Sequence, residues 1–411
     1  MYNKLINLTN CCALTTDADN SLWNNLLDCG KELKTAFEAG GFEECRRLLE
    51  RKRDEWMYVP LNVAVIGNSG SGKSSFINAI RGLTADEDGA APVGVHETTL
   101  DIESYPHPNN QLVKLWDLPG VGTNRFRRKT YLSDIHIDRY DFFLLITADR
   151  FTENDTWLGN EFRKRNKKYF FVRTKIGDDI LNNKKAHPGT HKEEAVVREI
   201  RESTKKQLRE NGFEDVAVFL IDSYECHKFE FSKLEEHFLE KFNDLKRSVL
   251  ILSMHATSKE MIGRKVKELR SRIWMTAALS AMGAPVTSLF KATPCHVHLL
   301  TMQAGFYCRQ LGLDETSLKR YAVQKRSTAQ SIVGRCLACG DSDEQRCKNL
   351  VESLVEHGTP LWTPSESTHL SVIRFFLAAP QYYEGTYHVL EFVLRKMESA
   401  ALEIVKLEVE S

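Results

Sequence analysis

The spacing of apolar residues divides the chain into a helical beginning, a middle that forms a sheet, and a helical end. Over residues 21–55 apolar side chains recur at helical spacing, and the pair Gly40 and Gly41 interrupts them, which predicts two consecutive helices. From about 60 to 222, short and almost wholly apolar runs alternate with polar helical stretches. Such runs are typical of a mostly parallel sheet with helices on both faces. The runs are LNVAVIG, LVKLWDL, YDFFLLIT, YFFVRT and VAVFLI, and TLDIESYPH is expected to add an antiparallel edge strand.

Helical spacing returns after about residue 230 and continues to the end of the chain. In the tail the apolar residues form one broad stripe, which is more typical of a buried core than of a membrane anchor. We therefore predict an α/β fold for residues 58–245, preceded by a helical segment at 1–57 and followed by an all-α domain at 246–411.

Charge, apolar runs and cysteine content indicate which partners and which cellular compartment to expect. The 56 basic and 56 acidic side chains cancel, so no overall field draws the chain toward nucleic acid or an anionic membrane surface. No apolar run approaches the roughly 20 residues that a membrane-spanning helix needs. Ten cysteines lie scattered along a chain that begins without a secretory signal, which predicts reduced thiols and a cytoplasmic protein.

The cysteine pattern nearest to a metal site is CLAC, at Cys336 and Cys339. Cys347 and His357 follow it, but at spacings that match no familiar zinc module. Ordinary buried or surface thiols are therefore the preferred interpretation, and a zinc site is the alternative.

A glycine-rich loop, GNSGSGKS, stands between the first predicted strand and a predicted helix. Gly67, Gly70 and Gly72 let the backbone turn so closely that its N–H groups can point at phosphate oxygens, and the helix N-terminus adds positive potential. Lys73 would reach the β- and γ-phosphates, and the Ser74 hydroxyl would bind Mg²⁺. The alternative, a glycine-rich surface turn, is disfavoured because a strand and a helix flank the loop. The nucleotide contacts expected here are Gly67, Gly70, Ser71, Gly72, Lys73, Ser74 and Ser75.

Further motifs follow in the order and at the spacing of a GTPase. An apolar strand ends in DLPG, which supplies Asp117 for the outer shell of the metal and Gly120, whose N–H can sense a γ-phosphate. Between the loop and DLPG lies GVHETT, where Thr99 is placed to close over Mg²⁺. After the fourth apolar run, Thr174 can brace the phosphate loop and the stem of Lys175 can cover a purine. A switch loop held by Mg²⁺ and γ-phosphate would convert the nucleotide state into a change of surface shape.

These motifs resemble those of the immunity-related GTPases, the interferon-inducible, dynamin-like GTPases of vertebrate cell-autonomous defence. The phosphate loop reads GKS rather than GMS, and in this respect the chain is similar to the effector subgroup of that family. The resemblance implies a GTPase (G) domain set on a helical domain built from both chain ends, with residues 246–411 packing against the N-terminal segment. It spans most of the chain and is carried by GNSGSGKSSFINAIRGL, DGAAPVGVHETT, LWDLPGVGT, YDFFLLIT, FVRTK, RIW at 272–274 and LGLDETSLKRYA at 311–322.

The resemblance also implies partners and a location. It implies GTP-dependent dimers and oligomers that form through G domains, with further copies or with related GTPases, on pathogen-containing vacuole membranes. N-myristoylation requires a glycine where Tyr2 stands, so attachment would need an amphipathic helix or acylation of a cysteine such as Cys11 or Cys12. A wholly cytosolic protein is the alternative, and no contact with nucleic acid is expected.

Hydrolysis cannot follow the Ras pattern, because Val121 stands where Ras-type enzymes place the glutamine that orients water. The resemblance implies that a glutamate of switch I orients the attacking water, in a site that two facing G domains complete. The residue that matches this glutamate is Glu97. The alternative interpretation of Glu97 is a solvated loop charge. The expected catalytic set is Glu97, Lys73 and Thr99, and the expected magnesium set is Ser74, Thr99 and Asp117.

The base-reading motif of a GTPase is altered here. An aspartate normally follows T-K-x and accepts from guanine N1 and the exocyclic amine, but Gly177 stands at that place. The Ser-Asn of the family after the last strand is replaced by Asp222 and Ser223. Gly177 permits unusual torsions, so the Asp178 carboxylate, one residue further on, could substitute as the reader. Weakened base selectivity is the second interpretation, and Asp178 as an ordinary solvated charge is the third.

Two functional classes therefore remain. The first is a GTPase that binds and hydrolyses GTP with Mg²⁺ to give GDP, and that turns over faster at higher protein concentration because dimers complete its site. The second is a catalytically weak or inactive regulatory module that binds nucleotide with relaxed base selectivity. The intact phosphate loop favours the first class, and Gly177 favours the second.

Overall fold

The structure is a computed structural model of the 411-residue chain. It describes residues 17–94, 101–122, 126–226, 228–256, 258–282, 294–319, 323–338, 340–356 and 380–409. Contacts divide the chain into two compact units, which we name the α/β unit (56–265 with 404–411) and the helical unit (1–55 with 266–403). The domain boundaries predicted after residues 57 and 245 stay a prediction.

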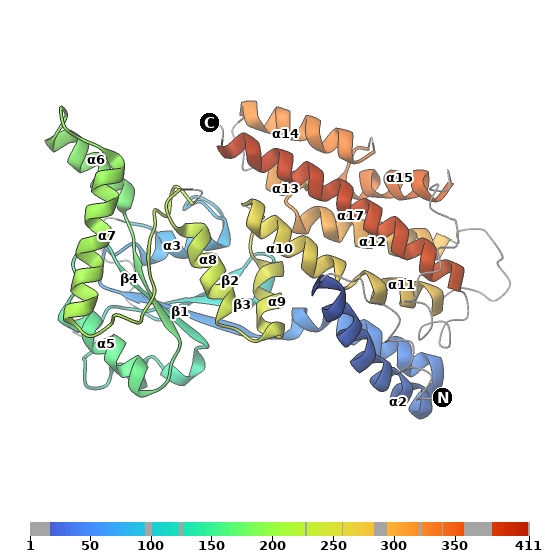
Figure 1. Ribbon diagram of the computed structural model, residues 1–411, viewed down its shortest axis with the longest axis horizontal. Helices are drawn as coiled ribbons and strands as arrows, with labels where there is room; N and C mark the ends of the chain where they lie inside the picture. The colour runs from blue at the N-terminus through green and yellow to red at the C-terminus, as the bar shows by residue number, and fades with distance from the viewer. Residues whose placement is uncertain are drawn as a thin grey trace. The chain divides into compact units, whose positions relative to one another are not determined.

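Among the described residues, the α/β unit contains a six-stranded sheet with the strand order β2-β3-β1-β4-β5-β6. At one edge β2 pairs antiparallel with β3, and the other neighbouring strands pair in parallel (Figure 1). The predicted mostly parallel sheet and its antiparallel edge strand are confirmed. The strands are β1 (Leu61–Gly67), β2 (Glu103–His107), β3 (Asn110–Asp117), β4 (Phe142–Thr147), β5 (Tyr169–Arg173) and β6 (Val218–Leu220).

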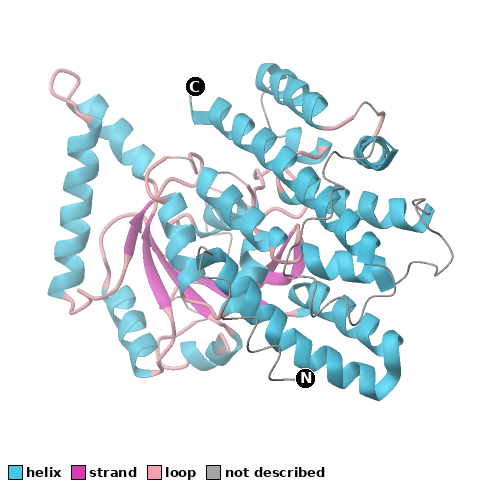
Figure 2. Ribbon diagram, turned by 45° about the vertical axis from the view of Figure 1, so that its right-hand side comes forward, coloured by secondary structure: helices cyan, strands magenta, loops and turns pink. Residues whose placement is uncertain are grey.

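Helices cover both faces of this sheet, which explains why its central strands are mostly apolar (Figure 2). All residues of β4 are buried. Phe142 packs edge to face against Phe238 with ring centroids 4.9 Å apart, whereas the next residue, Phe143, stacks on Phe162 at 4.4 Å. Successive strand residues point to opposite faces, so the helices that carry Phe238 and Phe162 lie on opposite sides of the sheet. The helices from the phosphate loop onward are α3 (Lys73–Arg81), α4 (Tyr131–Asp134), α5 (Glu153–Lys164), α6 (Ile176–Ala186), α7 (Glu193–Glu210), α8 (Phe231–Glu240), α9 (Asp244–Ser253) and α10 (Lys259–Arg270).

In the helical unit, residues from distant parts of the sequence share one core. Leu49, Trp274 and Tyr383 are buried in the same apolar cluster. Burial of apolar surface is the main favourable contribution to folding, so this cluster joins the early and late helices of the unit. The helices are α2 (Asp17–Asp54), α11 (Ile273–Met282), α12 (Pro294–Gln310), α13 (Glu315–Leu318), α14 (Val323–Cys336), α15 (Asp343–Glu356) and α17 (Pro380–Val409), of which the residues from 404 onward are assigned to the α/β unit.

Helix α2 is broken at Gly40 and Gly41, as the sequence predicts. Gly41 has φ of 65° and ψ of −150°, a backbone conformation that is essentially restricted to glycine. The break lets the two halves of α2 contact each other, since the Cys45 thiol donates to the Leu33 carbonyl at 3.3 Å. The predicted pair of consecutive helices is therefore confirmed.

Two further expectations concern membranes and metals. Within the described ranges, no helix combines the length and the hydropathy that crossing a membrane requires. Cys336 and Cys347 are buried, whereas Cys339 and His357 lie outside the described residues. In the part of the chain that the structure describes, no group of three or more histidine, cysteine, aspartate or glutamate side chains could hold a metal ion.

A carboxyl group and an amine are buried together in the α/β unit, at Glu235 of α8 and Lys265 of α10. Burial raises the pKa of Glu235 from its ordinary value of 4.5 to about 8, and it lowers the pKa of Lys265 to about 7. Because the folded pKa of Glu235 is raised, its contribution to stability is complete below about pH 4.5 and is lost as the pH rises through about 8. Lys265 acts with the opposite sign, and its contribution is lost as the pH falls through about 7.

We expect the Glu235→Gln substitution to flatten the pH dependence of the free energy of unfolding between about pH 4.5 and 8. An amide does not titrate, so the variant lacks the loss of stability that ionisation of the buried carboxyl group causes in the wild type. Urea unfolding at several pH values measures this slope. Glu236→Gln is the matched control, because Glu236 is only partly buried and pairs with Arg264 at 3.5 Å. Equal slopes for the wild type and Glu235→Gln would contradict the prediction.

Candidate nucleotide-binding site

The glycine-rich loop leaves the carboxyl end of β1 and enters α3. Gly67, the last residue of β1, pairs in register with Ile146 of β4. A Cβ atom added to Gly67 would lie 2.0 Å from the Ile146 carbonyl oxygen, so only glycine fits at this position. Gly70 and Gly72 have φ of 73° and 87°, in the left-handed region that favours glycine. Close strand contact and loop curvature together account for the three glycines.

The start of α3 presents backbone N–H groups that no side chain caps. Gly72 occupies the N-cap position, and the structure shows no side-chain hydrogen bond to the first turn there. The first N–H groups of a helix need acceptors from outside the helix, and they attract anions. Within the described residues, the buried Ser71 hydroxyl also has no hydrogen-bond partner. These groups suit a ligand that brings several acceptor oxygens, such as a phosphate.

Lys73 and Ser74 lie on the first turn of α3 and join the loop to the metal-binding motif. Lys73 is buried, and its Nζ donates to the Asn68 carbonyl at 3.3 Å, which holds the ammonium group against the loop. The Ser74 hydroxyl donates to Asp117 Oδ2 at 2.8 Å. Parallel pairing of β1 with β3 places Asp117 opposite Val65 and so brings the two motifs together. Hydroxyl and carboxylate oxygens are hard ligands of the kind that Mg²⁺ prefers, so this pair fits a magnesium ion.

The DLPG segment after β3 packs against the phosphate loop. A Cβ atom added to Gly120 would lie 3.4 Å from the Gly67 carbonyl oxygen and 3.7 Å from the Ser69 nitrogen, so the backbone of Gly120 borders the loop. The next side chain, Val121, is buried in an apolar cluster that includes Phe126. A buried valine cannot hydrogen-bond an attacking water, so this position contributes packing rather than catalysis.

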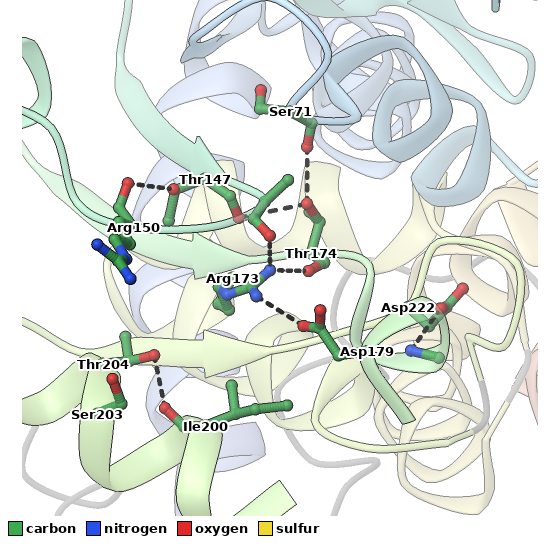
Figure 3. A network of polar contacts seen from close by, with 12 residues as sticks. Ser71, Thr147, Arg150, Arg173, Thr174, Asp179, Ile200, Ser203, Thr204 and Asp222 are labelled. Carbon is green, nitrogen blue, oxygen red and sulfur yellow. Dashed lines mark hydrogen bonds and ion pairs between the residues drawn. The ribbon is translucent and has the colours of Figure 1, made fainter. Parts of the chain in front are cut away.

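Thr174 connects the loop after β5 to the phosphate loop (Figure 3). Its hydroxyl donates to the Ser71 carbonyl at 2.7 Å, and its N–H donates to the Thr147 carbonyl at 2.9 Å. Thr174 is only 1% exposed, so both bonds are shielded from water. One buried residue thus links the ends of β4 and β5 to the loop after β1.

The two aspartates that follow Gly177 lie in different surroundings. Asp179 accepts from Arg173 Nη2 at 2.6 Å, and Arg173 is buried at the end of β5 (Figure 3). Asp178 is exposed on the first turn of α6. Lys175 is also exposed and has φ of 59°, immediately before that helix. The role of Asp178 as the base reader stays a prediction.

Gly177 contacts Asp222, a residue that was not among the predicted site residues. The Gly177 N–H donates to Asp222 Oδ2 at 3.0 Å, and a Cβ atom added to Gly177 would lie 2.6 Å from that oxygen. The other oxygen of Asp222 accepts from the Tyr224 N–H at 2.8 Å. The sequence contained a signal for this contact. Relative to the family pattern, the chain lacks a carboxylate at 177, where Gly177 stands, and has an additional one at Asp222.

The described site residues lie at the carboxyl ends of parallel strands, in the loops that follow them or in the first turn of the next helix. Neighbouring parallel strands present these loops at one edge of the sheet, where α/β proteins bind ligands. Glu97 and Thr99 lie outside the described residues, so their catalytic and magnesium roles stay predictions. The site residues that the structure describes are Gly67, Gly70, Ser71, Gly72, Lys73, Ser74, Ser75, Asp117, Gly120, Thr174, Lys175 and Asp178.

Known proteins resemble this chain over most of its length. The family model described as interferon-inducible GTPase (IIGP) matches residues 29–359. Interferon-gamma-inducible GTPase 10 of Mus musculus is 30% identical over 92% of this chain and 88% of its own. Interferon-inducible GTPase 1 of Mus musculus is 36% identical over 64% of this chain and 63% of its own. A solved bacterial selenocysteine-specific elongation factor, EF-Sec, aligns with a TM-score of 0.32 and 16% identity over 45% of this chain and 30% of that chain. The extent of the family match confirms the resemblance of the motifs, and this chain belongs to the interferon-inducible, or immunity-related, GTPase family.

Proposed function

We propose that this protein binds GTP with Mg²⁺ at the phosphate loop and hydrolyses it to GDP and phosphate. The observation that carries the proposal is the 2.8 Å hydrogen bond between Ser74 and Asp117, because it unites the phosphate-binding and metal-binding motifs in one site. Membership in a family of GTPases supports a guanine nucleotide as the ligand.

Each part of the site has a task in this proposal. The backbone N–H groups of residues 67–75 would hold the phosphates, and Lys73 would neutralise charge on the β- and γ-phosphate oxygens. Ser74 and Asp117 would hold Mg²⁺, which would further neutralise the triphosphate. The backbone of Gly120 borders the loop, and its N–H would contact the γ-phosphate and so distinguish GTP from GDP.

We further propose that a second copy of the chain completes the hydrolytic site. The buried Val121 leaves the water-orienting task to another residue, and Glu97, assisted by Thr99, would take it when two G domains meet across their nucleotides. Turnover per molecule would then depend on the fraction of dimer. The second candidate, a regulatory module that binds nucleotide but hardly hydrolyses it, is supported by the same buried valine.

Phosphate release at several protein concentrations, with saturating GTP and Mg²⁺, separates the two candidates. We expect the rate per molecule to rise steeply with protein concentration, since the dimer fraction rises. The Glu97→Gln variant should bind GTP but lose this rise. A flat background rate at every concentration, with GTP still bound, would instead support the regulatory module. Absence of heat from every purine triphosphate in calorimetry, with folded protein and ample Mg²⁺, would overturn nucleotide binding itself.

Relatives of this chain are named interferon-inducible or immunity-related GTPases, and these names support our proposal of a role in innate, cell-autonomous immunity. We propose a cytoplasmic protein that forms homo-oligomers through its G domains, assembles with related GTPases, and associates peripherally with intracellular or pathogen-vacuole membranes. Sedimentation with liposomes, with and without a GTP analogue, tests the membrane part of this proposal. Protein that stays in the supernatant under both conditions would overturn that part and leave nucleotide binding untouched.

A further inference from the structure

The Asp222 carboxylate lies next to the position that the Cβ atom of a side chain at 177 would occupy. In an aspartate, covalent geometry places each carboxylate oxygen about 2.4 Å from its own Cβ atom. Asp222 Oδ2 lies 2.6 Å from the Cβ position at Gly177, and Asp222 Cγ lies 3.4 Å from it. The loop after β6 therefore brings a carboxylate oxygen to the distance from residue 177 at which an aspartate there would carry its own.

The missing side chain and the added carboxylate depend on each other. A Cβ atom only 2.6 Å from Asp222 Oδ2 would displace that carboxylate from its present position. Glycine at 177 removes this collision, and it also brings the Gly177 N–H within 3.0 Å of the same oxygen. Glycine at 177 therefore accommodates the Asp222 carboxylate in its present position.

The Asp222 carboxylate is held in place and can still accept further hydrogen bonds. Oδ2 accepts from the Gly177 N–H, and Oδ1 accepts from the Tyr224 N–H at 2.8 Å. Each carboxylate oxygen can accept two hydrogen bonds, so each has capacity for one more. Guanine presents two neighbouring donors, N1–H and the exocyclic amine, which a carboxylate can accept together. Because the backbone already orients Asp222, little conformational entropy would be lost on binding.

Tyr224 connects this carboxylate to the phosphate end of the site. Its side chain is 78% exposed, and its hydroxyl lies 3.3 Å from the Ser75 hydroxyl at the start of α3. Asp222 itself is buried, with an exposed fraction of 7%, so its surroundings hold the carboxylate in a fixed position. We propose that the Asp222 carboxylate reads the guanine base in place of the side chain that is missing at Gly177. The inference rests on the proposed function, because it names the base-selecting group of the same site.

The neighbouring aspartates match this task less well. Asp179 is paired with the buried Arg173 at 2.6 Å, so its carboxylate already has a cationic partner. Asp178 is exposed to solvent, where a side chain keeps more rotamer freedom and its hydrogen bonds compete with water. Asp222 has neither disadvantage.

The test changes the hydrogen-bonding groups of residue 222 and of the base in a matched way, by combining an asparagine at 222 with XTP in place of GTP. Xanthine carries a carbonyl where guanine carries its amine, so its edge offers one donor and one acceptor, which an amide matches and a carboxylate does not. In Asp222→Asn we expect the ratio of GTP affinity to XTP affinity to fall roughly 100-fold below that of the wild type. Competition of GTP, XTP and ATP against mantGTP, with Mg²⁺ and the full-length chain, measures this ratio. Because both affinities come from the same variant, a general loss of stability does not change it.

Further variants separate base reading from a merely structural role. Asp215→Asn is the matched control, since it makes the same change in an exposed carboxylate that precedes β6, and its GTP-to-XTP ratio should equal that of the wild type. Asp178→Asn tests the competing reader, and its ratio should also stay unchanged. Asp222→Ser should lose the preference for GTP. The double variant Gly177→Asp, Asp222→Ser should regain the preference, because the serine removes the carboxylate that lies 2.6 Å from the Cβ position at 177.

The possible failures are distinct from one another. A fall of the ratio in Asp178→Asn but not in Asp222→Asn would overturn the inference and assign the base to Asp178, while GTP binding stood. Equal affinity of the wild type for GTP, XTP and ATP would also overturn it and would leave the phosphate site intact. If no purine triphosphate bound to the wild type, the proposed function and this inference would both be overturned.

Discussion

Substitution of Lys73 by alanine is expected to weaken the binding of Mg²⁺·GTP more than 100-fold while the α/β unit stays folded. Hydrogen bonds to charged groups contribute about 1.5 to 3 kcal/mol each, and Lys73 would make them to both the β- and the γ-phosphate. A loss of about 3 kcal/mol or more corresponds to an affinity at least roughly 100-fold weaker. Isothermal titration calorimetry with GTP and Mg²⁺ measures the change.

The control for this experiment is another lysine of the same unit. Lys246 in α9 pairs with Asp141 at 2.5 Å, and Asp141 immediately precedes β4, at the opposite edge of the sheet from the phosphate loop. Lys246→Ala should therefore leave GTP affinity unchanged. If Lys73→Ala bound Mg²⁺·GTP as tightly as the wild type, the phosphate loop would not be the binding site of the triphosphate.

Substitution of Gly67 by alanine is expected to lower the free energy of unfolding of the α/β unit by about 3 kcal/mol or more. The added Cβ atom would lie 2.0 Å from the Ile146 carbonyl oxygen and 2.9 Å from the Ser71 hydroxyl oxygen. Ile146 belongs to β4, which is hydrogen-bonded to β1 through this register, so no change of side-chain rotamer can relieve the contact. The strands would have to separate at the point where the phosphate loop begins. Urea unfolding followed by circular dichroism measures the loss.

A second glycine of the same unit provides the comparison. A Cβ atom added at Gly189 meets no atom within 4 Å, and Gly189 does not have a positive φ. Gly189→Ala should therefore change the free energy of unfolding by no more than about 0.5 kcal/mol. Equal stabilities of Gly67→Ala and Gly189→Ala would show that the close contact between β1 and β4 is not rigid.

The helices and strands could be predicted from the sequence because their causes are local. The FFLLIT run of β4 is apolar from Phe142 to Ile146 because both faces of a central strand are covered, and that pattern is visible in the letters alone. The break in α2 lies at Gly40 and Gly41, and Gly41 has φ of 65° and ψ of −150°, a conformation that other residues rarely adopt. The phosphate loop is likewise one continuous segment, so its glycines, its lysine and its serine are neighbours in the sequence as well as in space.

Contacts between loops were not predictable in the same way. The Ser74 hydroxyl reaches Asp117 because β1 and β3 are adjacent, although β2 lies between them in the sequence. Thr174 reaches the Ser71 carbonyl because the ends of β4 and β5 lie beside the loop after β1. Strand order is decided by the packing of the whole sheet, and a short stretch of sequence does not contain that information.

By itself the sequence determined that this protein has a mostly parallel sheet, a phosphate loop in its proper setting, and a base-reading motif without its aspartate. Only the tertiary structure decided which carboxylate lies beside Gly177. Proximity in the sequence favours Asp178, yet the first turn of α6 leaves that residue exposed. Asp222 is 45 residues away along the chain and reaches Gly177 because β5 and β6 pair in parallel, which places the loops at their carboxyl ends side by side.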